Sequence, residues 1–294
     1  LTNVPPFFVS LTNNHLSMKK KFLLILVILN SFCNFSIAQY SFMSFNLRYD
    51  NAGDKENSWV NRRDELSSMI LKYHPDVLGI QEGLYSQVTF LDSSLTDYNY
   101  AGVGRDDGDK KGEFSAVFFN TKKFSLLASK TYWLSLTPEK VSVGWDAAME
   151  RIVTFATLIS LNHSDTIYVF NTHMDHIGKV AREKSAELIW SIIITNNLAK
   201  NKLIVMGDFN STPDESAAQL FLANMDCGFN SKNVNTSGPM GTFNAFNVAD
   251  SVTKRIDYIF TKNMIVTDYQ HINERRNNNL WLSDHLPVYC KVHF

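Results

Sequence analysis

Runs of β-branched and aromatic residues recur along the chain and predict most of its strands. Each run is short and is bounded by turn-forming residues, a pattern typical of strands in a sheet. The runs lie at 40–47, 76–81, 114–120, 151–159, 166–171, 202–207, 256–260 and 286–293. We find no internal repeat, low-complexity tract or interdomain linker between them, which favours a single folded unit.

Three stretches between these runs carry apolar residues at helical spacing and predict helices. The first covers 61–73 and is stopped by Pro75. The same spacing predicts helices over 179–198 and 211–221, with Pro213 in the first turn of the last one. Strands interleaved with helices, with some strands adjacent in sequence, predict an α/β domain with mixed sheets.

One apolar run near the start of the chain differs from the others. Met18 is followed by three lysines, then by the apolar stretch 22–29, and later by Ser36 and Ala38. This order is typical of a secretory signal peptide that is cleaved after Ala38. The run is shorter than the roughly 20 residues that span a bilayer. The alternative interpretation is a buried N-terminal helix or strand.

We therefore divide the chain into three parts. Residues 1–17 are interpreted as an upstream extension, 18–38 as the signal peptide and 39–294 as one exported domain, periplasmic or extracellular. We expect no stable membrane insertion once the signal is removed, and we expect a monomer.

Composition adds little to this interpretation until the predicted signal peptide is left out of the count. The 294 residues are 45% hydrophobic, enough for one large core, and carry a net charge of -1. Three lysines are the only charged residues before position 39, so the predicted mature domain has 25 basic and 29 acidic residues, a net charge of -4. This excess of acidic residues argues against a protein that binds nucleic acid through a basic surface.

Two cysteines remain in the predicted mature domain, Cys227 and Cys290. Exported proteins often form disulfides, but both segments suit buried free thiols equally well. The sequence leaves the two possibilities open.

Polar side chains stand at the ends of several predicted strands, where α/β enzymes place their sites. Taken singly, each has an ordinary structural use as a cap, a turn residue or a buried imidazole. Asp257 is different, because an acid inside an apolar strand is costly to bury without a partner. The candidates at strand ends are Asn46, Gln81, Glu82, Asn171, His173, Asp208, Asn210, Asp284 and His285.

Taken together and in order, these residues resemble the endonuclease/exonuclease/phosphatase superfamily of metal-dependent phosphoesterases. The matching blocks are Ser44–Arg48, Gln81–Glu82, Asn171–His173, Gly207–Ser211, Arg255–Ile259 and Ser283–Val288. The Gly-Asp-Phe-Asn and Ser-Asp-His blocks are the most specific, and the connecting segments resemble the secreted bacterial branch. The resemblance implies a four-layer α/β sandwich, with two mixed β-sheets packed face to face and flanked by helices.

The resemblance also implies a metal site. Glu82 would be the principal ligand, with Asn46 beside it and Asp284 completing the metal environment directly or through water. Carboxylate and amide oxygens without cysteine suit Mg²⁺ or Mn²⁺ better than a thiolate zinc centre.

The remaining implied roles concern the phosphate. Asp208 would be the general base that orients water, and Asn210 would hold the nucleophile or a phosphate oxygen. His285 would lie against the phosphate, held by Asp257, and His173 would supply a second hydrogen bond or proton.

Three further positions are candidates with weaker signals. Arg151 is a candidate phosphate clamp, because a guanidinium matches two oxygens at once, and a surface salt bridge is its alternative. Asp175 and His176 either extend the site or form a polar turn. The segments 105–107 and 145–146 are expected on rim loops that set substrate selectivity.

The sequence thus predicts a secreted metal-dependent phosphoester hydrolase, in which an Asp-activated water attacks a phosphodiester or phosphomonoester in line. One alternative is an extracellular nuclease that degrades DNA or RNA, and another is a catalytically inactive binding module of the same fold. An exposed aromatic hairpin, which would indicate a membrane-docking sphingomyelinase, is not evident.

Overall fold

A computed structural model of the protein describes residues 39–293. The predicted upstream extension, 1–17, and the predicted signal peptide, 18–38, lie outside the described residues. Within the described part, no helix has both the length and the apolar character that a membrane crossing requires.

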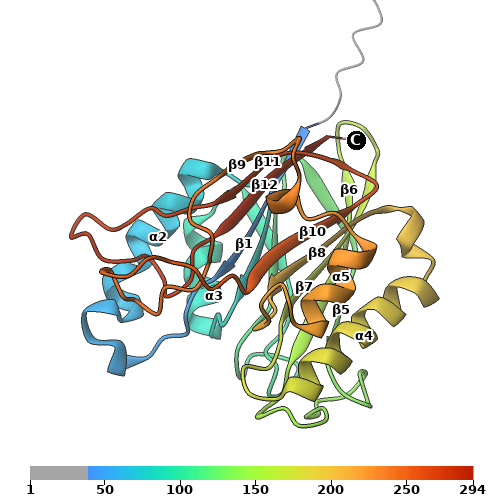
Figure 1. Ribbon diagram of the computed structural model, residues 1–294, viewed down its shortest axis with the longest axis horizontal. Coiled ribbons are helices and arrows are strands. Elements are labelled where there is room, and N and C mark those ends of the chain that lie inside the picture. Colours follow the sequence, from blue (N-terminus) through green and yellow to red (C-terminus); the bar gives the residue numbers. More distant parts are fainter. Residues whose placement is uncertain (1–38, 294) are drawn as a thin grey trace, which may run out of the picture. The chain divides into compact units, whose positions relative to one another are not determined.

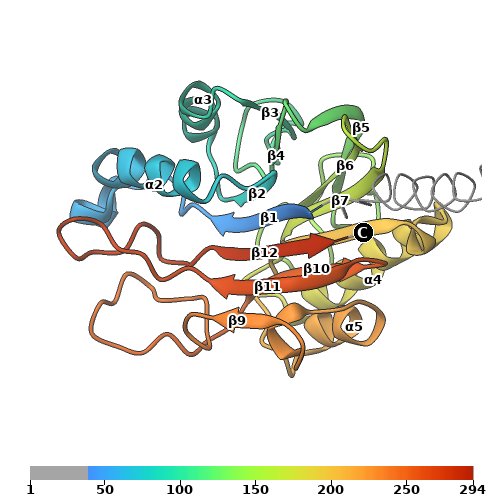
Figure 2. The same ribbon diagram turned by 90° about the horizontal axis from the view of Figure 1, so that it is seen from above.

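Two mixed β-sheets form the centre of the fold (Figures 1 and 2). One has seven strands in the order β3-β4-β2-β1-β12-β11-β9, and the other has five in the order β10-β8-β7-β6-β5. The strands are β1 (Gln39–Asn46), β2 (Val77–Gln81), β3 (Tyr98–Ala101), β4 (Val117–Asn120), β5 (Phe124–Trp133), β6 (Ile152–Ser160), β7 (Thr166–His173), β8 (Lys202–Asp208), β9 (Asn235–Ser237), β10 (Asp257–Lys262), β11 (Ile265–His271) and β12 (Val288–His293).

Helices cover the outer faces of the two sheets (Figure 1). The seven-stranded sheet carries α2 (Trp59–Tyr73) and α3 (Tyr85–Ser94), and the five-stranded sheet carries α4 (Lys179–Thr195) and α5 (Ser216–Asn224). Short 3-10 helices are η1 (Ala52–Asn57), η2 (Leu198–Lys200) and η3 (Gly228–Asn230). This arrangement confirms the predicted four-layer α/β sandwich.

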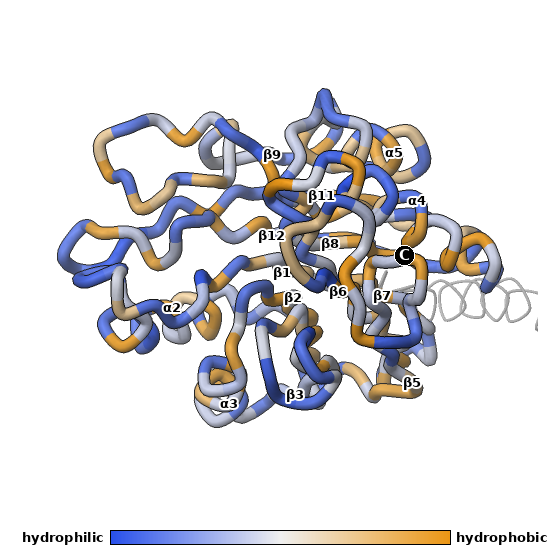
Figure 3. The backbone as a smooth tube through the Cα atoms, turned by 90° about the horizontal axis from the view of Figure 1, so that it is seen from below, coloured by the Kyte–Doolittle hydropathy of each residue, from blue (hydrophilic) through white to orange (hydrophobic). Residues whose placement is uncertain are grey.

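Strand β1 shows how the sequence builds the layers. Its side chains alternate between the two faces of the sheet. Phe42 joins the core shared with the five-stranded sheet, whereas Met43 and Phe45 pack beneath the helices of the other face. Ser44 and Asn46 follow Phe42 on the inner face, so this face becomes polar at the carboxyl end of the strand. Figure 3 shows how hydrophobic and hydrophilic residues are interspersed along the backbone.

The two sheets approach closely where Asn171 of β7 faces β2. The Asn171 amide nitrogen donates to the carbonyl oxygens of Ile80 at 2.8 Å and Ala116 at 2.9 Å, and its oxygen accepts from Gln81 at 2.6 Å. A Cβ atom at Gly79 would lie 2.7 Å from that oxygen, so this strand position requires glycine. Asn171 and Gln81 therefore join the sheets behind the site.

The eight predicted strands correspond to β1, β2, β4, β6, β7, β8, β10 and β12. The prediction missed β3, β5, β9, β11 and α3. Their signals are weak because many of their residues are exposed or half-buried: all three residues of β9 are exposed, and β5 is largely solvent-facing.

The helix predicted from 211 begins later than expected. The structure starts α5 at Ser216 with Glu215 at the N-cap position, so placing Pro213 in the first helical turn was wrong. The backbone N–H of Thr212 donates to the Glu215 carboxylate at 2.7 Å. This local bond stabilises a turn in competition with the helix.

Cys227 and Cys290 are both buried free thiols in the structure. The Cys227 thiol donates to the Tyr269 hydroxyl at 3.9 Å. Burial raises the pKa of both thiols, which makes them poor nucleophiles.

Candidate active site

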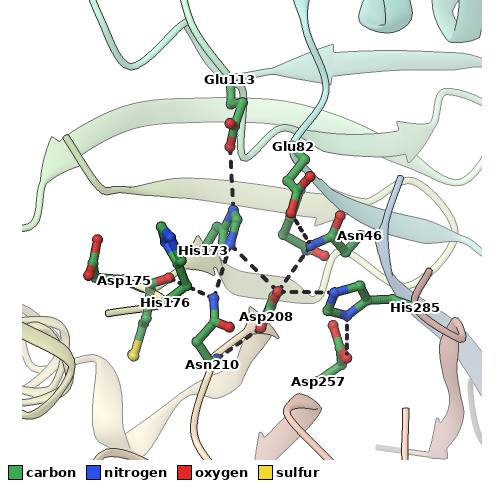
Figure 4. Close-up of polar contacts among 12 residues, drawn as sticks. Asn46, Glu82, Glu113, His173, Asp175, His176, Asp208, Asn210, Asp257 and His285 are labelled. Atoms are coloured by element: carbon green, nitrogen blue, oxygen red, sulfur yellow. Dashed lines mark hydrogen bonds and ion pairs between the residues drawn. The ribbon is translucent and has the colours of Figure 1, made fainter. Parts of the chain in front are cut away.

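Seven of the polar residues singled out above meet at one edge of the sandwich, and Figure 4 labels all of them except Asp284. Three of them end β1, β7 and β8, and a fourth follows β2. The others precede or begin β10 and β12, which run antiparallel to β8 and β1, so their amino ends lie at the same edge. The residues are Asn46, Glu82, His173, Asp208, Asp257, Asp284 and His285.

The seven-stranded sheet supplies an amide and a carboxylate that face each other. The Asn46 amide nitrogen lies 3.0 Å from Glu82 Oε1 and 3.0 Å from Asp208 Oδ2. Glu82 adopts a left-handed backbone conformation (φ 60°), and its other oxygen accepts from the backbone N–H of Tyr49 at 3.1 Å. These contacts fix Glu82 against Asp208 across the boundary between the sheets.

The five-stranded sheet places Asp208 at the centre of the cluster (Figure 4). Its Oδ1 accepts from the backbone N–H of Asn210 at 2.8 Å, and its Oδ2 lies 3.5 Å from His173 Nε2. The Asn210 amide nitrogen donates to His173 Nε2 at 3.2 Å. Because Nε2 accepts this bond, the neutral His173 ring carries its proton on Nδ1.

Two histidine–carboxylate pairs flank Asp208. Asp257 Oδ2 accepts from His285 Nδ1 at 2.9 Å, while His285 Nε2 faces Asp208 at 3.7 Å. On the opposite side, His173 Nδ1 lies 3.6 Å from Glu113 Oε2. The site therefore has an imidazole on each side of one central carboxylate.

The surroundings drive the two imidazoles to opposite protonation states. Burial and the nearby Arg151 lower the pKa of His173 to about 3, so this ring is neutral at physiological pH. Burial also disfavours the charge on His285, but the carboxylates of Asp257 and Asp208 outweigh it and raise its pKa well above the ordinary value. His285 is thus an imidazolium, protonated on both nitrogens, that donates from Nδ1 to Asp257 and points Nε2 toward Asp208.

Two carboxyl groups near this imidazolium have raised pKa values. Burial raises the pKa of Asp208, and the neighbouring Asp257 raises it further. Burial likewise raises the pKa of Asp284 to about 6, with a contribution from Glu82. A raised pKa means that the ionised form of a buried carboxyl group is disfavoured, and a nearby cation stabilises that ionised form. The oxygen donors of this site therefore fit a hard divalent metal.

Two ligand sets compete for that metal. Glu82, Asp208 and His285 place one potential ligand atom each within 4.8 Å of one another. The set predicted from sequence is Asn46, Glu82 and Asp284, which shares only Glu82 with it. The raised pKa of His285 favours the second set, because a proton on Nε2 would have to leave before that nitrogen could bind a metal. In that set Asn46 stays as it is held: its oxygen accepts from the Arg48 backbone N–H at 2.9 Å and its nitrogen donates to Glu82, so it would orient the principal ligand.

The cluster opens into a cavity of about 530 Å³. Three arginines on its wall each pair with a carboxylate: Arg48 with Asp54 at 2.9 Å, Arg105 with Glu113 at 2.8 Å, and Arg151 with Asp175 at 3.2 Å. The wall comprises Arg48, Tyr49, Glu82, Arg105, Glu113, Met149, Arg151, His173, His176, Asp208, Asn210, Phe243, Asp284 and His285.

Arg151 is buried at the cavity wall, which excludes the surface salt bridge considered as its alternative. Its guanidinium donates to Asp175 and, at 2.8 Å, to Nδ1 of His176, while its second terminal nitrogen has no hydrogen-bond partner among the described residues. Asp175 and His176 thus contact Arg151, and Asp175 also forms the polar turn considered as the alternative, because it accepts from the backbone N–H groups of Ile177 and Gly178 at 2.9 and 2.6 Å. Asp146, predicted on a rim loop, accepts from the backbone N–H of Ala181 in the first turn of α4 at 2.6 Å.

Sequence reasoning missed Glu113, the partner of His173. It lies just before β4, which runs antiparallel to β2, so the amino end of β4 meets the carboxyl end of β2. A search for polar residues at the amino ends of predicted strands, and not only at the carboxyl ends, would have found it.

Comparisons with known proteins agree with this geometry. The family model described as "Endonuclease/Exonuclease/phosphatase family" matches residues 43–285. A crystal structure of a protein of that family from Bacteroides thetaiotaomicron is 31% identical, with a TM-score of 0.83 over 88% of this chain and 99% of that chain. A mannosyl-6-phosphatase from the same species is 30% identical, with a TM-score of 0.81 over 87% of this chain and 100% of that chain.

Among curated proteins, L388 of Acanthamoeba polyphaga mimivirus is 29% identical over 161 residues. That match covers 52% of this chain and only 59% of the viral protein's length. The family match, by contrast, includes every block from β1 to the Ser-Asp-His segment. The chain belongs to the endonuclease/exonuclease/phosphatase family of phosphoesterases.

Proposed function

We propose that this phosphoesterase hydrolyses phosphate monoesters of small neutral polyols, with sugar phosphates as the main class. The observation that carries this proposal is the pairing of every arginine on the cavity wall with its own carboxylate. The name of the mannosyl-6-phosphatase relative supports the same substrate class.

The pairing of these arginines with carboxylates makes nucleic acid a poor substrate. A polynucleotide binds through several lysines and arginines that neutralise successive phosphates. Here Arg48, Arg105 and Arg151 present hydrogen-bond donors whose charge is already balanced. Such donors suit the hydroxyl groups of a neutral leaving group better than a row of further phosphates. The net charge of -4 predicted for the mature domain points the same way.

The roles of the residues follow from their contacts. Asp208 is the general base for the attacking water, oriented by the Asn210 backbone N–H that holds its second oxygen. The His285 imidazolium donates from Nε2 to a phosphate oxygen, and Asp257 fixes its ring. His173 stays neutral and positions the Asn210 amide. A Mg²⁺ or Mn²⁺ ion at Glu82, Asn46 and Asp284 would neutralise phosphate charge.

A substrate panel tests this proposal. Purified protein is assayed with sugar phosphates, inositol phosphates, sphingomyelin, DNA and RNA, with Mg²⁺ or Mn²⁺ and with a chelator. We expect sugar phosphates to have the highest kcat/KM and the chelator to abolish turnover, while Asp208→Asn is inactive. Preferred hydrolysis of DNA or RNA would establish the nuclease alternative instead. Inertness toward every phosphoester would favour the inactive binding module.

We also propose that the domain is exported. The support is the segment 18–38, with its lysines, apolar run and small residues before Gln39. Intact-mass analysis of protein secreted by a bacterial host is expected to show a chain that begins at Gln39. Retention of the uncleaved segment on an intracellular protein would contradict export.

A further inference from the structure

Arg62 of α2 is the bulkiest fully buried side chain in the described part of the protein, with an exposed fraction of 0%. Its donors go to backbone carbonyls. Nε donates to Asn57 at 2.9 Å and one terminal nitrogen donates to Arg48 at 2.7 Å. The other terminal nitrogen donates to Leu282 at 3.2 Å and also to Leu47. One guanidinium thus bridges four carbonyl groups in three segments of backbone.

Three of these carbonyls belong to the loops that present the predicted metal ligands. Leu47 and Arg48 directly follow Asn46, and Leu282 lies two residues before Asp284. These loops come from sequence positions more than 200 residues apart, at the end of β1 and the start of β12. Arg62 therefore holds the two loops at a fixed separation.

A second contact joins the same two loops. The Ser283 hydroxyl donates to the Asn46 carbonyl at 2.7 Å and lies 3.3 Å from Asp284 Oδ1. The Arg48 backbone N–H, in turn, donates to the Asn46 side-chain oxygen at 2.9 Å. The hydrogen bonds that Arg62 and Ser283 make to the backbone therefore also restrict the positions of the Asn46 and Asp284 side chains.

Packing alone does not explain an arginine here. A charged guanidinium in a fully buried position is costly unless it is satisfied by hydrogen bonds, and an apolar side chain of similar volume would fill the space more cheaply. Arg62 also lies beside the Trp59 ring, with its guanidinium carbon 5.1 Å from the centroid. What the guanidinium adds over an apolar residue is its rigid fork of donors.

We propose that Arg62 is a positioning residue for the metal half of the site, and that Ser283 assists it. By fixing the loops that carry Asn46 and Asp284, it sets the affinity of the site for a divalent cation. The inference rests on the metal-dependent part of the proposed function, but it does not depend on the substrate class.

Mn²⁺ titration of the full chain by calorimetry, without substrate, tests this inference. Arg62→Lys keeps the charge but loses the fork, and we expect it to weaken Mn²⁺ binding by about 10-fold or more, the scale typical of residues that orient ligands. Ser283→Ala is a small change in case Arg62→Lys does not fold, and we expect it to weaken binding by about 3-fold or more.

Arg276 provides the matched control. It is also buried, and it donates to the carbonyls of Glu56 and Asn61 at 3.0 and 3.2 Å and to the Asn57 side chain at 2.7 Å. None of these side-chain hydrogen bonds goes to a residue of either ligand loop. We expect Arg276→Lys to lower the melting temperature and to leave Mn²⁺ binding unchanged. Unaltered Mn²⁺ affinity in Arg62→Lys or, should that variant not fold, in Ser283→Ala would overturn the proposal. Equal losses in Arg62→Lys and Arg276→Lys, or no Mn²⁺ binding by the unaltered protein, would do the same.

Discussion

The two sheets contribute chemically different halves to one site. The seven-stranded sheet supplies Asn46, Glu82 and Asp284, which are held by backbone N–H groups and loop contacts. The five-stranded sheet supplies Asp208, whose neighbours are imidazoles. Fixed oxygen ligands suit a bound cation, whereas a carboxylate between two imidazoles suits proton transfer. In the proposed function, the boundary between the sheets would separate the metal ligands from the general base, while His285 reaches Asp208 from the loop before β12.

Replacing the central carboxylate should break the proton-transfer half most severely. Asp208→Asn keeps the shape but removes the base, so we expect kcat to fall by about 1000-fold, within the range for a lost general base. Steady-state kinetics at saturating Mn²⁺ measures this loss. We expect calorimetry to show Mn²⁺ affinity within about 3-fold of the unaltered protein, since a neutral amide leaves the proposed ligands in place.

That calorimetric result also separates the two ligand sets. If Asp208→Asn lost Mn²⁺ binding together with turnover, Asp208 would belong to the metal site, as the cluster of Glu82, Asp208 and His285 allows. The sheet boundary would then not separate the two functions.

Replacing Glu82 should break the other half. Glu82→Gln removes the ligand common to both sets, and we expect Mn²⁺ binding to weaken by about 100-fold, because a neutral amide is a poorer ligand for a hard cation. Turnover at low Mn²⁺ should fall in parallel and recover partly as Mn²⁺ is raised. Full activity at low Mn²⁺ would remove Glu82 from the metal site.

The Asp257–His285 pair should shift the pH dependence without abolishing activity. Its carboxylate helps to raise the pKa of His285, so the imidazolium and the stability it contributes are present at low pH and are lost as pH rises through that pKa. Asp257→Asn lowers the pKa, so we expect the alkaline limb of kcat/KM to move to lower pH. The loss at pH 7 should be about 10- to 100-fold.

A matched variant tests the sign of this effect. Glutamine does not titrate, so the kcat/KM profile of His285→Gln should lack the alkaline limb that we assign to His285. That limb is the one expected to move in Asp257→Asn. Movement of that limb to higher pH in Asp257→Asn would contradict the proposed pairing. Chemical unfolding of the metal-free proteins should show that Asp257→Asn loses less stability than the unaltered protein as pH rises.

The sequence predicted the fold where burial makes a strong pattern. Strands buried on both faces, such as β8 with its run from Leu203 to Met206, were predicted within a residue or two. Strand β9 was missed because its exposed residues leave no apolar periodicity. The start of α5 was misplaced because the hydrogen bond between Thr212 and Glu215 stabilises a turn in place of the first helical residues. The spacing of apolar residues does not reveal such a bond.

The site was predictable to the extent that its residues stand at strand ends. Asp208 and His285 follow from ordered motifs, and the acid at Asp257 drew attention because burial demanded a partner. Glu113 and Arg62 were missed for a different reason. Each acts through a residue distant in sequence, His173 or Leu282, and only the antiparallel and interlayer contacts of the folded chain bring these together.

The smallest expected effect concerns the cavity wall, where neither half of the site is altered. Arg151→Lys keeps a positive charge near Asp175 but replaces the fork that also reaches His176. If Arg151 binds the leaving group equally in the ground state and the transition state, KM should rise by about 10-fold while kcat changes by less than about 3-fold.

Arg182 supplies the control for this variant. It donates to the Asp175 backbone carbonyl at 3.2 Å and pairs with Glu215 at 3.1 Å, but it does not line the cavity. Arg182→Lys should therefore leave KM unchanged. A fall in kcat with constant KM for Arg151→Lys would instead place its guanidinium on the phosphate in the transition state. In that case Arg151 would act with Asp208 and His285 in the reaction and not in substrate selection.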